Sequence, residues 1–262
     1  MSEWDGEGYA QVSGLQRTLA KASLSGLELT GTERLLDVGC GDGFITLELA
    51  GRLPRGSVVG VDASAGMVDK ARSRPVPDGA TATFRVADAR ELPFADEFDV
   101  VVSFNALHWV VEQRRALSGI ARAAHPSARV IIQMVCASER PSVEAVAMRV
   151  CRAPAWAESF AGFEPPFTHP DPAGYPELAA SAGLVVTDLR TSDLDWDFGS
   201  REDFSRWCAV GFASWTARLD AGKASRFVDD VVRAYEEVSG GPGLFRFTQM
   251  RVALAVASGP RG

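Results

Sequence analysis

A glycine-rich turn is the first place in this chain where residue types and spacing suit a chemical task. It runs from Asp37 to Gly43 (DVGCGDG), between a short apolar run and a segment with helical periodicity. Glycines let a backbone turn sharply and approach a ligand without obstruction by side chains. The helix that follows would offer free N–H groups and the positive end of its dipole. The turn therefore predicts a ligand site beside main-chain amides.

The spacing of these glycines separates the turn from a dinucleotide-binding turn. The dinucleotide fingerprint requires a third glycine three residues after the second. Phe44 stands at that position, and Gly43 comes one residue sooner. This difference argues against a nicotinamide-dependent oxidoreductase.

Carboxylates follow the next two strand-like segments. Asp62 comes after the turn at the spacing expected of an acid that binds a ribose, because its oxygens can accept hydrogen bonds from both hydroxyls. Asp88, followed by Ala89, can accept from an adenine amino group, and Met67 can pack on the adenine ring. Either aspartate alone is explained equally well as the cap of a helix or turn. Their joint placement after the glycine turn favours a site for one adenosine.

The elements that must position these residues alternate between strands and helices. Apolar runs separated by amphipathic segments are typical of a parallel sheet covered on both faces, with ligands beyond the carboxyl ends of its strands. We expect strands at Leu35–Val38, Ser57–Val61, Thr81–Val86, Phe98–Phe104 and Arg129–Val135, with helices at Phe44–Leu53, Met67–Ala71 and Gln113–Ala124.

The pattern changes after the fifth strand. Ser142 and Ser200 are suited to cap helices, and a proline-rich stretch with several aromatics lies between them. Further elements are expected at Pro176–Ala182 and Ala224–Val238 (helices) and at Leu184–Leu189 and Phe245–Ala257 (strands). We therefore predict three parts: 1–138 with an N-terminal helix and the cofactor-binding part, 139–175 as a cap insertion, and 176–262 with the rest of the sheet and a second helical cap at about 200–240.

From Glu33 to Val135 the chain resembles the class I S-adenosylmethionine-dependent methyltransferase domain. The glycine turn, Asp62, Asp88 and the Phe98-Asp99-Val100-Val101 strand match that family's ordered motifs. The resemblance implies an α/β fold with a doubly wound, seven-stranded, mostly parallel sheet, its last strand antiparallel, and a helical cap or lid. It implies S-adenosyl-L-methionine as cofactor, held at its methionine part by Gly39, Gly41 and their neighbours, at its ribose by Asp62 and at its adenine by Asp88 with Ala89. Asp37, Cys40, Ala63, Met67 and Asn105 are counted with these cofactor residues.

Two short stretches suggest a narrower resemblance. Asn105-Ala106-Leu107-His108-Trp109, together with Tyr9 and Leu15-Gln16-Arg17, is similar to the trans-aconitate methyltransferase-like group, which includes enzymes that make methyl esters of small carboxylic acids. In that group the N-terminal helix helps to close the cofactor pocket. The resemblance therefore adds Tyr9 to the cofactor residues, and Gln16 as a contact to the cofactor's amino-acid end.

Methyl transfer is an in-line displacement at an activated carbon, so the protein must align the reacting atoms and exclude water. A carboxylate acceptor needs no base, whereas a phenol or alcohol generally does. His108 is the candidate base, and a plain hydrogen bond to cofactor or backbone explains it equally well. Candidates for the acceptor pocket, with core packing or a surface ion pair as the ordinary alternatives, are Trp109, Trp156, Trp207, Trp215 and Arg201.

The leading function is therefore methylation of a small molecule, with O-methylation of a carboxylate or hydroxyl as the first interpretation. A C- or N-methyltransferase of specialised metabolism is the alternative, and a non-catalytic nucleoside-binding partner subunit is an alternative of another class. His125 and His169 are expected at a surface and in a loop.

Composition narrows the partners. With 27 basic against 34 acidic residues the net charge is -7, which argues against nucleic acid or an anionic membrane as partner. The 4 cysteines form no Cys-x-x-Cys pair, so we expect no metal site and reduced thiols in a cytoplasmic protein. The N-terminus lacks the apolar segment of a signal peptide. Monomer and homodimer both stay open.

Overall fold

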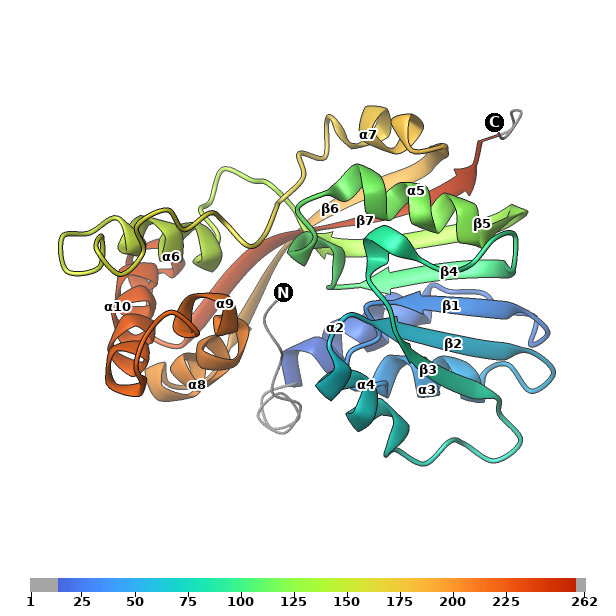
Figure 1. Cartoon of the computed structure of the whole chain (residues 1–262), viewed down its shortest axis with the longest axis horizontal. Helices are drawn as coiled ribbons and strands as arrows, with labels where there is room; N and C mark the ends of the chain where they lie inside the picture. Colours follow the sequence, from blue (N-terminus) through green and yellow to red (C-terminus); the bar gives the residue numbers. More distant parts are fainter. Residues whose placement is uncertain (1–13, 258–262) are drawn as a thin grey trace.

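Seven strands form one sheet, in the order β3-β2-β1-β4-β5-β7-β6, in the computed structural model, which describes residues 14–257 (Figure 1). Strands β1 to β5 are parallel, and β7 is antiparallel to both β5 and β6. The predicted doubly wound sheet with an antiparallel last strand is confirmed. The strands are β1 (Arg34–Val38), β2 (Ser57–Asp62), β3 (Ala82–Val86), β4 (Phe98–Phe104), β5 (Ala124–Val135), β6 (Leu184–Asp197) and β7 (Leu244–Val256).

The central strands are apolar on both faces because helices cover both. Leu35 and Val100 point to the layer that contains α2 (Gly14–Ser25) and α3 (Phe44–Gly51). The next residues along, Leu36 and Val101, point to the opposite layer. That layer contains α5 (Gln113–Ala123) and α7 (Tyr175–Ser181), while α4 (Ala65–Arg72) packs beside α3. Alternate side chains of one strand thus serve two cores.

The strand order reverses beside β1. The chain runs outward from β1 to β2 and β3, then returns to place β4 on the other side of β1. Ligands of open α/β sheets bind at such a switch point, outside the carboxyl ends of the strands. The glycine turn follows β1, Asp62 is the last residue of β2, and Asn105 follows β4, so all three reach this edge.

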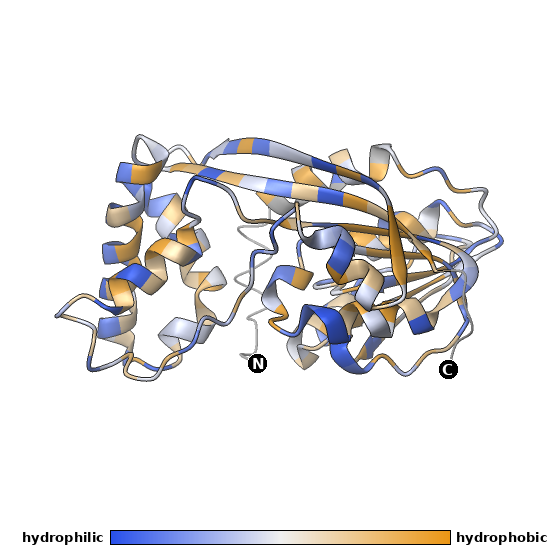
Figure 2. Cartoon of the chain, turned by 90° about the horizontal axis from the view of Figure 1, so that it is seen from above, coloured by the Kyte–Doolittle hydropathy of each residue, from blue (hydrophilic) through white to orange (hydrophobic). Residues whose placement is uncertain are grey.

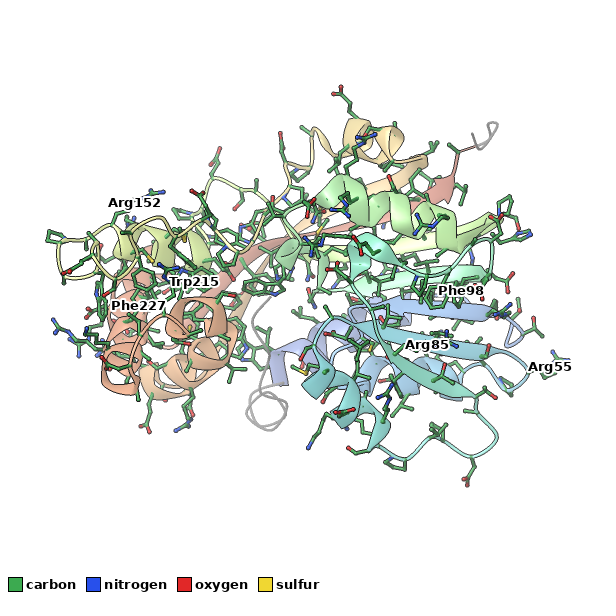
Figure 3. The ribbon with its side chains drawn as sticks, viewed as in Figure 1. Arg55, Arg85, Phe98, Arg152, Trp215 and Phe227 are labelled. Atoms are coloured by element: carbon green, nitrogen blue, oxygen red, sulfur yellow. The ribbon has the colours of Figure 1, made fainter. Side chains whose placement is uncertain are left out.

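A second group of helices lies beyond the carboxyl edge of the sheet. It consists of α6 (Val143–Cys151), α8 (Arg201–Gly211), α9 (Ala213–Thr216) and α10 (Ala221–Ser239), and we call it the helical body. Seen from above, it stands apart from the sheet and is joined to it by long strands (Figure 2). It has its own aromatic core, in which Trp215 and Phe227 are fully buried far from Phe98 of the sheet (Figure 3).

Serine caps set the starts of two helices of this body. The Ser142 hydroxyl accepts a hydrogen bond from Ala145 N at 3.1 Å, and the Ser200 hydroxyl accepts one from Asp203 N at 3.1 Å. Such a bond satisfies one of the amides that a helix start leaves without a partner. The caps predicted at both serines are confirmed.

Strand β6 is much longer than the predicted Leu184–Leu189, since it extends to Asp197. Its outer half pairs with β7 beyond the end of β5, as a two-stranded ribbon. Leu194 and Trp196 pack on the helical body, whereas Asp193 and Asp195 are exposed. This alternation signals a strand with one buried face, and the sequence prediction missed it.

Two other boundaries differ from the predictions by three residues or more. Helix α10 begins at Ala221 rather than Ala224, because Asp220 caps it by accepting from Lys223 N at 2.8 Å. Strand β5 begins at Ala124 rather than Arg129. Within residues 14–257, none of the helices has the length and apolarity needed to cross a membrane.

Gly56 offers a test of how closely the chain before β2 packs on the backbone of Glu33, which precedes β1. A Cβ there would lie 2.2 Å from Glu33 O, which also accepts a hydrogen bond from Ser57 N and so cannot move away. We expect Gly56→Ala to lower the free energy of unfolding by about 1–3 kcal/mol in urea titrations. Gly51→Ala is the matched control, since its Cβ would meet only Pro77 at 3.9 Å. Equal stability of the two variants would contradict the packing described.

Candidate functional site

A cavity of about 490 Å³ opens where the carboxyl edge of the sheet meets the helical body. Its volume lies within the range of small-ligand pockets. One end is formed by the glycine turn and the ends of β1, β2 and β4, and we call it the cofactor end. The other, acceptor end is formed by the helical body, β7 and the segment after β4, through side chains that include Trp109, Glu144, Pro166, Trp207, Phe212, Phe245 and Phe247.

The glycine turn leaves open space above its backbone. Gly39 N and Cys40 N donate to Val61 O at 2.7 and 2.9 Å, which ties the turn to β2. Gly39 has φ +79°, and a Cβ there would lie 2.1 Å from Ala106 Cβ. Gly41 has φ +53°, yet a Cβ there would meet no atom within 4 Å. The backbone at Gly41 therefore borders the cavity, where a bound molecule can reach its main-chain atoms.

Asp62 links the turn to the end of β2. Its carboxylate accepts from Gly41 N and from Ser64 N, both at 2.9 Å. Burial raises the pKa of Asp62, against the opposing effect of the hydrogen bonds from Ser64, Gly41 and Ala63. A carboxylate has about four acceptor positions. Asp62 therefore keeps acceptor capacity for hydroxyl groups of a ligand at the cavity wall, where it lies with Ala63 and Met67.

Asp88 and Ala89 also line the cofactor end. Asp88 caps a short 3-10 helix, accepting from Arg90 N at 2.9 Å, and is paired with the Arg90 guanidinium at 2.6 Å. These hydrogen bonds to Arg90 hold the pKa of Asp88 below its usual range. Asp88 therefore has the capping role that was one of its two predicted roles, and it also borders the cavity.

Asp37 is not in the cavity lining, although the sequence prediction grouped it with the cofactor residues. It lies behind the turn, fully buried, and accepts from Thr46 Oγ1 at 2.6 Å. Burial raises the pKa of Asp37 to about 7. Asp37 thus joins the end of β1 to helix α3, a supporting position rather than a contact position.

Asn105 lies at the end of β4, in the left-handed region with φ +55°. Its N–H donates to Gln133 O at 2.8 Å, and its Oδ1 accepts from Gln249 Nε2 at 2.5 Å. These bonds tie β4 to β5 and β7 at the wall of the cavity.

His108 lies in the next turn and lines the cavity with 5% of its surface exposed. Its Nδ1 is buried and has no hydrogen-bond partner among the described residues. Burial, and then the neighbouring His169 ring at 6.2 Å, lower the pKa of His108 to about 3. The imidazole is therefore uncharged at neutral pH. His169 lies in a loop, as predicted, and is mostly buried beside His108.

Glu144 is a cavity residue that the sequence analysis missed. It lies in the first turn of α6 and lines the cavity with 6% of its surface exposed. Val143, Val146 and Ala147 of the same helix are buried in the core of the helical body. The place of Glu144 directly beside these apolar residues, in the turn capped by Ser142, was the available signal.

The predicted acceptor residues fall into two sets. Trp109 and Trp207 line the cavity. Trp156 does not, because it packs on Phe227 and its Nε1 donates to Asp230 at 3.0 Å. Trp215 lies behind Trp109, with ring centroids 6.5 Å apart, and is fully buried in the helical body. For both, the core-packing alternative describes the position observed.

Arg201 is also placed away from the cavity. It is half-exposed at the start of α8 and forms a two-pronged pair with Glu236, at 2.5 and 2.6 Å. This pair occupies the guanidinium fork that the sequence analysis offered to a substrate carboxylate, so that prediction is corrected to a surface ion pair.

The N-terminal helix contributes apolar contacts. Leu15 and Leu19 of α2 line the cavity. Gln16 lies in the same helix, but its side chain is outside the part of the chain that the structure describes. Tyr9 lies outside the described residues altogether.

Comparison with known proteins gives consistent results. Residues 35–127 match the family described as a methyltransferase domain. The trans-aconitate 2-methyltransferase of Mycobacterium tuberculosis is 32% identical over 213 residues, which cover 75% of this chain and 77% of that protein. An uncharacterized methyltransferase of Schizosaccharomyces pombe is 32% identical over 134 residues, and the match spans half of each protein.

The fold comparison agrees. The crystal structure of the YcgJ protein from Bacillus subtilis is similar with a TM-score of 0.67 and 18% identity, covering 93% of this chain and all of that one. At this identity the likeness concerns the fold.

Asp62 can be tested by titration with S-adenosylhomocysteine. We expect Asp62→Asn to weaken binding by about 1–3 kcal/mol, because the amide releases Gly41 N–H and removes an acceptor at the cavity wall. Isothermal calorimetry measures the change, and Asp69→Asn is the control, since Asp69 is exposed on α4. Wild-type affinity in the Asp62 variant would show that another carboxylate faces the ligand.

Asp37 predicts a pH dependence. Its pKa is raised in the folded chain, so the folded state keeps a proton that the unfolded state releases between about pH 4 and pH 7. Its contribution to stability is therefore lost as pH rises through this window. As the pH rises from 5 to 8, we expect the free energy of unfolding of Asp37→Asn to increase by about 1–3 kcal/mol relative to that of the wild type. Urea unfolding of both proteins at both pH values measures this change. A difference that does not change with pH would contradict this.

Proposed function

Because the chain belongs to the family of class I S-adenosylmethionine-dependent methyltransferases, we propose that it methylates a small, largely apolar molecule at a hydroxyl oxygen. The observation that carries the proposal is one continuous cavity, with the glycine turn at one end and aromatic side chains of the helical body at the other. S-adenosylmethionine is the cofactor of the family.

We assign the cofactor end by chemistry. The open backbone at Gly41 suits the methionine part, Asp62 suits the ribose hydroxyls, and Met67 with Ala89 offers apolar contact to the adenine ring. The residues present therefore fit the cofactor. When bound, it supplies a methyl group already activated by a sulfonium sulfur.

The acceptor end favours a neutral group over a carboxylate. Among the described lining residues Arg90 is the single cation, and it is engaged by both Asp88 and Glu112. A carboxylate acceptor would meet Glu144 in an apolar wall, without a cation to offset its loss of hydration. We therefore propose that this chain does not methylate trans-aconitate, the carboxylate in the name of the trans-aconitate 2-methyltransferases.

The residues of the chain hold the acceptor and exclude water. Trp109, Trp207 and Phe247 present apolar surface, and α2 adds Leu15 and Leu19. An uncharged His108 can accept a hydrogen bond from the acceptor hydroxyl and so aim an oxygen lone pair. Its lowered pKa makes it a weak base, so we assign it orientation of the hydroxyl and transient relay of the released proton to solvent water, and not storage of that proton.

Two expectations from the sequence continue as proposals. A cytoplasmic location is supported by the reduced state of the four cysteines, all of them buried. Action as a monomer or homodimer on a free small molecule rests on the sequence argument alone.

The test compares acceptors and variants. We expect turnover of S-adenosylmethionine with 4-ethylphenol and none with 4-ethylbenzoate, measured as S-adenosylhomocysteine released. His108→Gln should lower kcat about tenfold, because the hydroxyl loses its orienting partner, with S-adenosylhomocysteine affinity unchanged. The control is His125→Gln, an exposed histidine bonded to Ser127. Preference for the benzoate, or full activity of the His108 variant, would contradict the proposal.

A further inference from the structure

Glu144 places a carboxylate in the wall of the acceptor end. It is more than nine-tenths buried, and it shares this wall with Trp109, Trp207, Pro166 and Phe212. Its place in the first turn of α6, near the positive end of the helix dipole, favours a negative charge there. Most of the other residues of this wall are apolar.

The described residues do not supply a cation for this carboxylate. His169 is nearest, with its Nε2 at 3.8 Å from Glu144 Oε2, which is beyond hydrogen-bond distance. Burial lowers the pKa of His169, so the imidazole is uncharged at neutral pH. Arg90 is bonded to Asp88 and Glu112 at the other end of the cavity.

A buried carboxylate without a partner is costly in free energy, and a ligand that brings a cation removes that cost. The rings of Trp109 and Trp207, which line the same cavity, favour the same charge, because aromatic faces attract cations. Buried charge and aromatic surface therefore point to one kind of ligand group.

We propose that the acceptor molecule carries a basic nitrogen and that Glu144 binds it as an ammonium group. This inference rests on the proposed function. An ammonium has no lone pair to attack the methyl carbon, so the nitrogen anchors the molecule while a hydroxyl elsewhere on it is methylated. The substrate class is that of small amino-phenols or amino-alcohols with an apolar frame. Glu144 is then the residue that determines specificity.

Three phenols that differ in the charge of one substituent test this inference. Tyramine is cationic, 4-ethylphenol is neutral and 4-hydroxyphenylacetate is anionic at pH 7.5. We expect the protein loaded with S-adenosylhomocysteine to bind tyramine at least about tenfold more tightly than 4-ethylphenol, and the acid most weakly, by calorimetry. In Glu144→Gln the preference for tyramine should disappear, and in the exposed control Glu158→Gln it should persist.

Several outcomes would overturn the inference. They are equal affinity for tyramine and 4-ethylphenol, no binding of tyramine, and a preference for tyramine that survives in Glu144→Gln. If Glu144→Gln instead weakens the binding of S-adenosylmethionine more than that of S-adenosylhomocysteine, the carboxylate stabilises the sulfonium and not an acceptor nitrogen. Failure of the wild type to bind S-adenosylhomocysteine would count against the proposed function and not against this inference alone.

Two further measurements separate binding from support of the fold. Glu144→Gln keeps the shape of the side chain and removes a charge that has no cationic partner within residues 14–257. Its midpoint of thermal unfolding should therefore equal or exceed that of the wild type. A lower midpoint would show that the fold already balances the charge, against the inference. Mass spectrometry of methylated tyramine should place the methyl group on oxygen, and N-methyltyramine would contradict an anchoring ammonium.

Discussion

The hydrogen bond from Gly41 N–H to the Asp62 carboxylate joins the two strand ends on which the site depends. It fixes the glycine turn against β2 while the backbone at Gly41 stays open to the cavity. Hydrogen bonds to Val61 O and the buried pair of Asp37 and Thr46 hold the same turn from other sides. Because β1 and β2 are parallel neighbours, their carboxyl ends meet, and one short contact can shape a site from residues distant in sequence.

A second constraint is that the cavity has two walls of different origin. The sheet edge supplies backbone amides and carboxylates, whereas the helical body supplies aromatic surface and one buried carboxylate. Strands β6 and β7 run through both parts, and Phe245 and Phe247 lie at the cavity on their way. The chemistry at the acceptor end therefore depends on how the helical body is packed as much as on the sheet.

The sheet and the cofactor end could be predicted from the sequence because their signals are local. Apolar runs, glycine spacing and single aspartates after strands are visible within a few residues of each other, and helix caps such as Ser142 and Ser200 are equally local. The acceptor end could not be predicted in the same way. Whether Trp156 or Trp207 faces the cavity is decided by which side of a helix meets which neighbour, and Arg201 is diverted by Glu236, 35 residues away. Glu144 was not predicted because the side of α6 that meets the cavity is set by contacts with elements distant in sequence, such as α10.

The position of Val135 in the chain has an evolutionary consequence. Before it come the glycine turn, Asp62 and Asp88, and after it come the helical body and β7. The acceptor end draws on both stretches, because His108 and Trp109 precede Val135 whereas Glu144, Trp207 and Phe247 follow it. Substitutions after Val135 can therefore change the shape of the acceptor end while the glycine turn stays intact.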